Sequence, residues 1–330
     1  MTLEIKTASL EPIRQTYAHT ERRFGAKPAT RYQEASFDIQ ATTNFHYRPL
    51  WKPEKTLNDP THSQIAMADW YALKDPRQFY YGAYVQHRAK MQDVAESNYA
   101  FFEKRDLSAN ISDDIKQSII DALVPFRYVE QTANLHMMSS TAYGYGTTLT
   151  QACIFSAMDR LGMAQYLSRI GLLLDGNTAT SLNDAKEAWM THPAWQPMRR
   201  LCEESLTVQD WFKVFLLQTL ILDSLMIATV YGSFDEYLDQ KGARDIAMLT
   251  EFMSDCLADL RKWSDSVLKT IVAESADNQA FAQACLDEWL PKAKEAFVHW
   301  AQLAMQTHDI SYGLNLIDER AKRIGLTINL

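Results

Sequence analysis

Apolar residues recur at steps of three and four along most of the chain after residue 75, the spacing that gathers them on one face of an α-helix. A strong stop follows one of these stretches at Asp175-Gly176-Asn177, and another stretch breaks at Gly144-Tyr145-Gly146. The pattern predicts long helices over 78–105, 112–140, 149–174, 198–232, 244–274 and 278–306, the last kinked at Pro291.

Residues 1–75 lack this helical period, yet they are not the polar sequence of a free tail. Aromatic residues need burial, and several recur in this segment: Tyr32, Phe37, Phe45, Tyr47 and Trp51. One interpretation is an extended arm that lies across a partner subunit, with these five residues as its partner contacts. The other is an arm that packs on the helices of its own chain. We therefore expect two parts, an arm over 1–75 and a helical domain over 76–330.

The composition fits a large helical core. The chain has 330 residues, of which 47% are hydrophobic, and only 11 glycines and 10 prolines interrupt it. No internal repeat of fixed period is present. A net charge of −8 argues against a nucleic-acid partner, which needs a basic face. The expected fold class is therefore an all-α bundle.

Cysteine usage and hydropathy indicate a cytoplasmic protein. The four cysteines form no Cys-x-x-Cys pair and fall in helical stretches, which is typical of buried free thiols. The first residues contain no apolar core of a secretory signal. The most apolar run, 211–234, carries Lys213, Gln218 and Asp223, so we expect a helix buried in protein and no membrane span.

Few acidic residues and histidines in the sequence have the spacing of metal ligands on a helix. A diiron site in a helical bundle uses Glu-x-x-His, because residues three apart share one helix face. Asp59 and His62 have a related spacing, but Pro60 lies between them. Glu295 and His299 stand four apart, where an ordinary surface contact explains them as well. We therefore predict no metal ligand, no cofactor site and no catalytic residue in this chain.

Carboxylates within apolar helices are the remaining candidates for chemistry: Glu130, Asp159, Asp223 and Asp255. None is followed by histidine three residues later, so we expect ion pairs or exposure instead of metal binding. The basic residues considered as partners are Arg127, Arg160, Arg199 and Lys262. His136 is expected to be a hydrogen-bonded core histidine. No Gly-x-Ser-x-Gly nucleophile elbow occurs, and Gly144-Tyr145-Gly146 follows no strand that would make it a phosphate loop.

Long and idiosyncratic strings resemble the β subunits of bacterial multicomponent phenol hydroxylases, within the family of soluble diiron monooxygenases. They lie at 31–38 (RYQEASFD), 44–49 (NFHYRP), 75–85 (DPRQFYYGAYV), 157–163 (AMDRLGM), 165–171 (QYLSRIG), 210–212 (DWF) and 247–253 (AMLTEFM). Together they span nearly the whole chain. The arm resembles the phenol branch more than the methane, toluene or alkene branches.

This resemblance implies a ferritin-like (ribonucleotide-reductase-like) bundle in an (αβγ)₂ hydroxylase. In that family the α subunit holds the diiron centre and hydroxylates phenol and related aromatics with O₂. A separate reductase with FAD and an iron–sulfur cluster supplies electrons from NAD(P)H, and a small effector protein regulates turnover. The β subunit keeps the fold without the ligands. The family's Asp-Glu-x-x-His strings would fall near 158–165 and 254–259, where this sequence has no histidine.

Three alternatives stay open at this point. The chain could be an independent carboxylate-bridged diiron enzyme, the equivalent β subunit of a toluene or alkene monooxygenase, or a helical module that binds a hydrophobic small molecule. We favour the hypothesis of a noncatalytic structural β subunit of a phenol hydroxylase, because of the arm, the helical body and the missing metal ligands.

Overall fold

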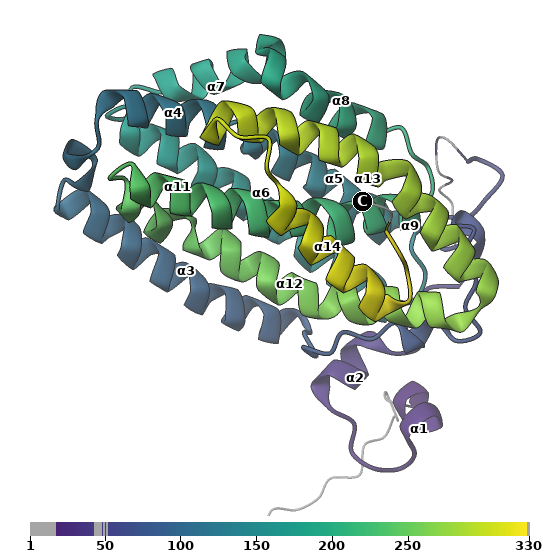
Figure 1. The fold of residues 1–330 in the computed structure, drawn as a ribbon. Coiled ribbons are helices and arrows are strands. Elements are labelled where there is room, and N and C mark those ends of the chain that lie inside the picture. The colour runs from purple at the N-terminus through teal and green to yellow at the C-terminus, as the bar shows by residue number, and fades with distance from the viewer. Residues whose placement is uncertain (1–17, 43–47, 49, 51, 329–330) are drawn as a thin grey trace, which may run out of the picture.

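The molecule is built from α-helices (Figure 1). The computed structural model describes residues 18–42, 48, 50 and 52–328, and this part of the chain contains no strand. The all-α prediction is therefore confirmed. The larger helices are α3 (Tyr81–Lys104), α4 (Asp113–Leu123), α5 (Phe126–Tyr143), α6 (Thr147–Leu174), α7 (Thr180–Thr191), α8 (Gln196–Ser205), α12 (Ala247–Glu274), α13 (Ala276–Met305) and α14 (Ser311–Ile324).

A long helix over Trp211–Gln240 runs through the middle of the molecule. It comprises α9 (Trp211–Leu216), α10 (Asp223–Leu225) and α11 (Phe234–Gln240), joined by two π-helical segments at Leu217–Leu222 and Met226–Ser233. α5 packs on α6 and α9, α6 packs on α12, and α12 packs on the π-helical segments. These four helices thus form a closed bundle. α3, α13 and α14 cover it from outside by packing on α12 (Figure 1).

Backbone carbonyl groups of the π-helical segment Leu217–Leu222 accept hydrogen bonds from a side chain of α14. The guanidinium of Arg320 donates from Nη1 to the carbonyl oxygen of Thr219 at 2.7 Å and to Oγ of Ser224 at 2.7 Å. Its Nη2 pairs with Asp265 on α12 at 2.6 Å. Arg320 is 1% exposed, so one buried side chain joins three helices. Gly313 allows α14 to approach this closely, because an added Cβ would lie 2.7 Å from Oγ1 of Thr229.

Two tryptophans complete the end of α4. Pro125 follows the C-cap residue Val124, and the carbonyl groups in the last turn of α4 need donors from elsewhere. The indole N–H of Trp195 donates to the carbonyl of Asp121 at 3.0 Å, and that of Trp300 donates to the carbonyl of Ala122 at 2.8 Å. Both tryptophan side chains are fully buried. The core therefore holds large aromatic groups without leaving these donors unpaired.

The long central helix contains a markedly apolar stretch. By length and composition Trp211–Gln240 is the one helix in the described residues that could cross a membrane, with a mean hydropathy of 1.8. However, 94% of its most apolar window is buried inside the molecule. An apolar helical stretch that other helices cover in this way belongs to the core of the bundle.

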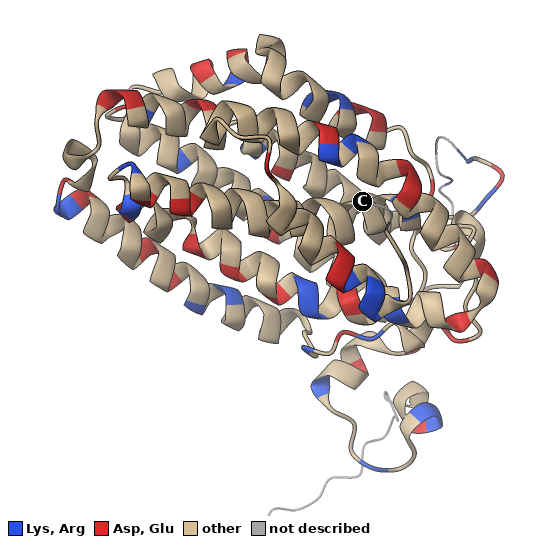
Figure 2. Cartoon of the chain, in the orientation of Figure 1, with Lys and Arg blue, Asp and Glu red and all other residues tan. Residues whose placement is uncertain are grey.

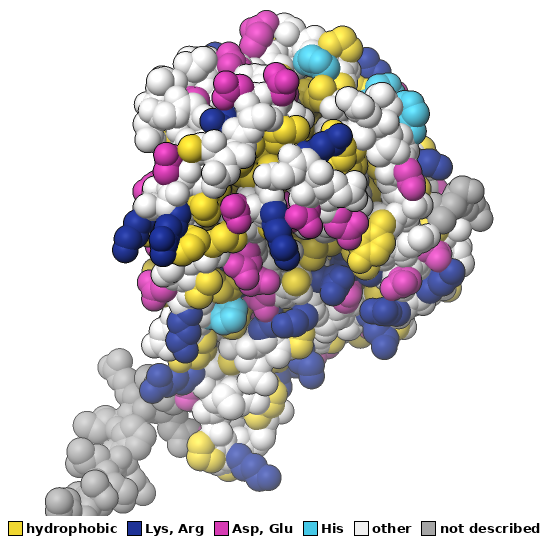
Figure 3. Space-filling model, turned by 60° about the vertical axis from the view of Figure 1, so that its left-hand side comes forward, with side chains coloured by type: hydrophobic (Ala, Val, Ile, Leu, Met, Phe, Trp, Pro, Cys, Tyr) yellow, Lys and Arg dark blue, Asp and Glu magenta, His cyan; other side chains and the backbone are white. Residues whose placement is uncertain are grey.

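Positions of Lys and Arg and positions of Asp and Glu are interspersed along the helices (Figure 2). On the face drawn in Figure 3, Lys and Arg side chains alternate with Asp and Glu, and apolar side chains lie between them. Charges of both signs are therefore mixed on this face.

The N-terminal arm is more ordered than its sequence pattern indicates. It contains two short helices, α1 (Ala18–Phe24) and α2 (Arg31–Ser36), which lie beyond one side of the bundle (Figure 1). Three buried aromatic residues form a small core of their own there, Tyr32, Phe37 and Tyr71. Arg23 pairs with Asp38 and Asp69 above this cluster.

Several helix boundaries differ from the sequence expectation. The predicted helix over 198–232 is wrong, because it divides into α8 and the Trp211–Gln240 helix. Asp210 ends the intervening loop as an N-cap, with Oδ1 accepting from the backbone N–H of Phe212 at 2.9 Å. α7 and α14 were not predicted as separate helices. Pro193 and Pro197 follow α7 closely, and the polar segment 306–309 precedes α14.

Replacing Arg320 by Met tests the α14 contact. We expect the free energy of unfolding to fall by roughly 3 kcal/mol, because the change breaks a buried ion pair and leaves backbone carbonyls without their donor. Denaturant unfolding followed by circular dichroism measures the difference. The matched control is Lys322→Met on the same helix, where the ion pair with Asp318 is exposed and a change within about 0.5 kcal/mol is expected. Equal effects of the two substitutions would contradict this account.

Candidate functional site

Three charged residues from three helices meet at the centre of the bundle. Arg160 of α6 directs Nη2 to Oδ2 of Asp223 at 2.6 Å and Nη1 to Oε2 of Glu130 at 3.4 Å. Glu130 lies on α5 and Asp223 on α10. Glu130 and Arg160 are each 1% exposed, and Asp223 is 7% exposed. The cluster is thus a guanidinium held between two carboxylates in an apolar core, which we call the core triad.

Hydrogen bonds extend the core triad toward α8. The side-chain amide of Gln218 donates to Oδ1 of Asp223 at 2.8 Å, so its oxygen is left to accept from Nδ1–H of His136 at 3.0 Å. Nε2 of His136 lies 2.8 Å from Oγ of Ser205. The expectation of a hydrogen-bonded core histidine is therefore confirmed. The two ring nitrogens of His136 are occupied by protein groups and are not free to ligate.

Burial controls the protonation of this region. It raises the pKa of Glu130 to about 7, although the positive charge of Arg160 acts in the opposite direction. It lowers the pKa of His136 to about 4, so that this side chain is neutral near pH 7. For Arg160 burial disfavours the cation, but Asp223 and Glu130 outweigh it and the pKa is raised. The guanidinium is paired mainly with Asp223, and this explains why burial prevails at the more distant Glu130.

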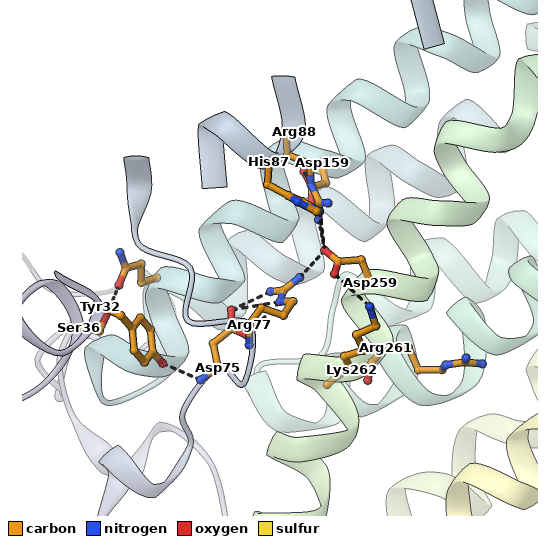
Figure 4. Close-up of polar contacts among 12 residues, drawn as sticks. Tyr32, Ser36, Asp75, Arg77, His87, Arg88, Asp159, Asp259, Arg261 and Lys262 are labelled. Carbon is orange, nitrogen blue, oxygen red and sulfur yellow. Dashed lines mark hydrogen bonds and ion pairs between the residues drawn. The ribbon is translucent and has the colours of Figure 1, made fainter. Parts of the chain in front are cut away.

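A second ionic network lies one residue away along α6 (Figure 4). Arg88 of α3 holds Asp159 with two parallel bonds, both 2.9 Å long, and the hydroxyl of Tyr84 donates to the same carboxylate. Nη2 of Arg88 also lies 3.0 Å from Oδ2 of Asp259 on α12. Such two-pronged guanidinium–carboxylate bonds are strong and directional. This network fixes α3 against α6 and α12.

The same network reaches the N-terminal arm (Figure 4). Arg77 bridges Asp259 at 3.3 Å and Asp75 at 2.9 Å. The backbone N–H of Asp75 in turn donates to the hydroxyl oxygen of Tyr32 at 2.7 Å. Ser36 at the end of α2 donates to the side chain of Gln151 on α6 at 2.7 Å. The arm is therefore attached to the bundle through polar contacts at the start of α3 and α6.

The aromatic residues proposed as partner contacts divide into two groups. Tyr32 and Phe37 are each 6% exposed, and their rings pack against one another and against Tyr71. In this structure they hold the arm together. Phe45, Tyr47 and Trp51 lie outside the described residues. Contact with a partner subunit stays a prediction for all five.

The two acid–histidine pairs do not form sites. Oδ1 of Asp59 accepts from the backbone N–H of Thr61 at 2.8 Å, whereas His62 points to the carbonyl oxygen of Thr56 at 2.6 Å. The ring of His299 contacts the backbone carbonyl of Glu295 at 2.9 Å, and the carboxylate is not involved. Within the described residues there is no group of three or more His, Cys, Asp and Glu placed to hold a metal ion.

Sequence reasoning found part of these networks. Arg160 was among the expected ion-pair partners, and it does pair with Glu130 and Asp223. The partner of Asp159 was missed, since Arg88 is distant in sequence. The available signal was the four-residue spacing of Tyr84 and Arg88, which places both on the face of α3 that meets α6.

A family model described as methane/phenol/alkene hydroxylase matches residues 51–275 of the chain. The chain belongs to this family. The match covers the second part of the arm, the four central helices and all members of the core triad. The all-α hydroxylase fold predicted from the resemblance is thus confirmed.

Several relatives within the hydroxylase family are similar along nearly their whole length. The chain is 64% identical to the phenol 2-monooxygenase oxygenase component MhpL of Acinetobacter pittii (strain PHEA-2), over 99% of this chain and 98% of the relative. It is 22% identical to the β subunit of the toluene-4-monooxygenase hydroxylase of Ectopseudomonas mendocina, over 92% and 93%. A crystal structure of phenol hydroxylase from Pseudomonas sp. OX1 superposes with a TM-score of 0.92 at 46% identity, over 99% of both chains.

Glu130→Gln tests the protonation of the core triad. Folding raises the pKa of Glu130 to about 7. Its favourable contribution to the free energy of unfolding is therefore present at low pH and is lost as the pH rises through 7. The stability of the variant relative to the native chain should therefore increase between pH 5 and pH 8, by up to about 3 kcal/mol. Denaturant unfolding of both proteins at several pH values measures this.

The control for this measurement is Glu236→Gln at an exposed position of α11. Its stability relative to the native chain should change little over the same pH range. A pH-independent difference between Glu130→Gln and the native chain would contradict a raised pKa at Glu130.

Proposed function

We propose that this chain is the noncatalytic β subunit of a phenol hydroxylase, the oxygenase component of a multicomponent monooxygenase. It supports a separate α subunit, whose diiron centre hydroxylates phenol and related aromatics with O₂. The single observation that carries the proposal is the buried Arg160 guanidinium between Glu130 and Asp223. A cation fixed at the centre of the bundle leaves no donor set for iron.

The relatives support the phenol branch. Two relatives at 64% and 48% identity are oxygenase components of phenol 2-monooxygenases. The more distant toluene-4-monooxygenase relative is a hydroxylase β subunit. The proposed complex is an (αβγ)₂ hydroxylase in the cytoplasm, served by an effector protein and by an NAD(P)H reductase that contains FAD and an iron–sulfur cluster.

A rigid neighbour has a physical use in such a complex. Metal ligands must be held within about 0.5 Å of their working positions, which demands that the helices carrying them be supported from outside. The ionic networks of this chain tie α3, α6 and α12 together, and Arg320 ties α14 to the central helix. The chain therefore offers its partner a bundle with little freedom to deform.

A triple substitution, Glu130→Gln/Arg160→Met/Asp223→Asn, tests the noncatalytic role in the assembled hydroxylase. It exchanges the core triad for neutral groups of similar volume, a change that is often tolerated when all charges of a buried cluster are removed together. We expect iron content per complex and phenol turnover within about twofold of the native values. Iron analysis and activity assays on the complex, coexpressed with the α and γ subunits, measure both.

Two outcomes would sink this proposal. One is loss of iron from the triple variant while the complex remains assembled. The other is stoichiometric iron in the native chain when it is purified alone. Either result would place a metal centre in this chain.

Deletion of residues 1–50 tests the arm as a partner contact. The bundle keeps its own core without these residues, so we expect a larger loss in assembly than in the melting temperature of the isolated chain. Co-purification with the α subunit and thermal unfolding measure the two effects. A matched deletion of residues 1–17 retains the aromatic cluster of Tyr32, Phe37 and Tyr71 and serves as the control. Full co-purification of the longer deletion would contradict a role in assembly.

A further inference from the structure

Two carboxylates at the centre of the four-helix bundle correspond to part of the layout of a diiron site. Such sites take one Glu from each of two helices and a Glu-x-x-His pair, three residues apart, from each of the other two. Here Glu130 of α5 and Asp223 of α10 supply the single carboxylates. α6 and α12 present pairs at the same spacing, Arg160 with Met163 and Cys256 with Asp259.

The residues at these positions do not fit iron. Arg160 is a permanent cation and cannot ligate. Met163 and Cys256 are fully buried, and burial raises the pKa of the Cys256 thiol, so that it stays protonated. Asp259 turns away toward Arg77 and Arg88 (Figure 4). Of the six positions of a diiron site, only Glu130 and Asp223 retain an inward carboxylate.

The two retained carboxylates nevertheless face a cation. Arg160 extends from α6 to the centre of the bundle, and its guanidinium contacts carboxylates from the two helices that would supply the single ligands. The cluster is also incomplete as a hydrogen-bonded ion pair. Oε1 of Glu130 and Nε of Arg160 are buried without a hydrogen-bonding partner in the described part of the chain. A buried carboxylate oxygen without a donor is a group that a metal ion would satisfy.

We propose that the bundle core is a latent divalent-metal site in which the Arg160 guanidinium occupies the place of the metal ion. The guanidinium supplies the positive charge that Asp223 requires and in part that of Glu130, and it thereby makes the fold independent of metal. This inference rests on the proposed function, because it treats the chain as a ligandless relative of a diiron subunit. Restoring the α6 pair should convert the core into a site for Fe²⁺, Co²⁺ or Zn²⁺.

The test is the double variant Arg160→Glu/Met163→His in the full chain, prepared without a histidine tag. The introduced carboxylate and imidazole would join Glu130 and Asp223 to give four ligands from three helices. With Co²⁺ as the probe, we expect one bound ion per chain, a visible absorption band of a low-coordinate Co²⁺ site, and a rise in melting temperature of several degrees. The native chain should show none of these.

Two further variants keep the result interpretable. Adding Glu130→Gln/Asp223→Asn to the double variant should weaken Co²⁺ binding by about tenfold or more, because two ligands are lost. Arg160→Met/Met163→His, which carries the imidazole without the new carboxylate, should bind Co²⁺ more weakly than the double variant. It also reports whether the core tolerates loss of the guanidinium.

Binding that is equal in the native chain, or insensitive to loss of Glu130 and Asp223, would overturn the proposal. So would a double variant that stays unfolded at every Co²⁺ concentration, since a formed site would supply the missing charge. Failure here leaves the proposed β-subunit function standing, because assembly and iron content of the native complex are separate measurements. Iron in the native chain alone would contradict both.

Discussion

A single guanidinium at the centre of four helices governs the rest of this structure. Removing charged groups from water is expensive, and a carboxylate buried without a partner would not stay ionised. Arg160 meets this requirement for Asp223 fully and for Glu130 in part, and each of the three groups comes from a different helix. Since the contact distances tolerate little sliding, the cluster sets the register of α5, α6 and the central helix.

Adjacent residues of α6 serve two different faces of that helix. Arg160 turns inward to the core triad, whereas Asp159 turns to Arg88 on α3. The second network then continues through Asp259 and Arg77 to the base of the arm. A change in the packing of α6 would therefore affect both the bundle core and the attachment of the arm. This coupling fits the structural role that we propose for the chain.

The arm is attached to the bundle at one end and has a small hydrophobic core of its own. Asp75, Arg77 and Ser36 make the polar contacts of this attachment. The small aromatic core includes Tyr32 and Phe37. Aromatic residues that the sequence offered as partner anchors thus have a first use within the chain itself. A surface presented on this small core is a more defined contact for a partner than a flexible tail would be, because less conformational entropy is lost on binding.

The hydrophobic period and the shortage of glycine and proline were enough to predict the all-α fold and most long helices. They failed between 198 and 232, because the loop 206–210 between the amphipathic α8 and the central helix contains no glycine or proline to mark the break. Local patterns likewise indicated that carboxylates such as Glu130 would be paired, since an unpaired charge in an apolar helix is too costly. Which cation they pair with depends on helices brought together from distant parts of the chain. The opposition of Glu130 and Asp223 across one guanidinium, and the hold of Arg88 on Asp159, arise only from tertiary packing, because the sequence carries no record of which helix faces meet.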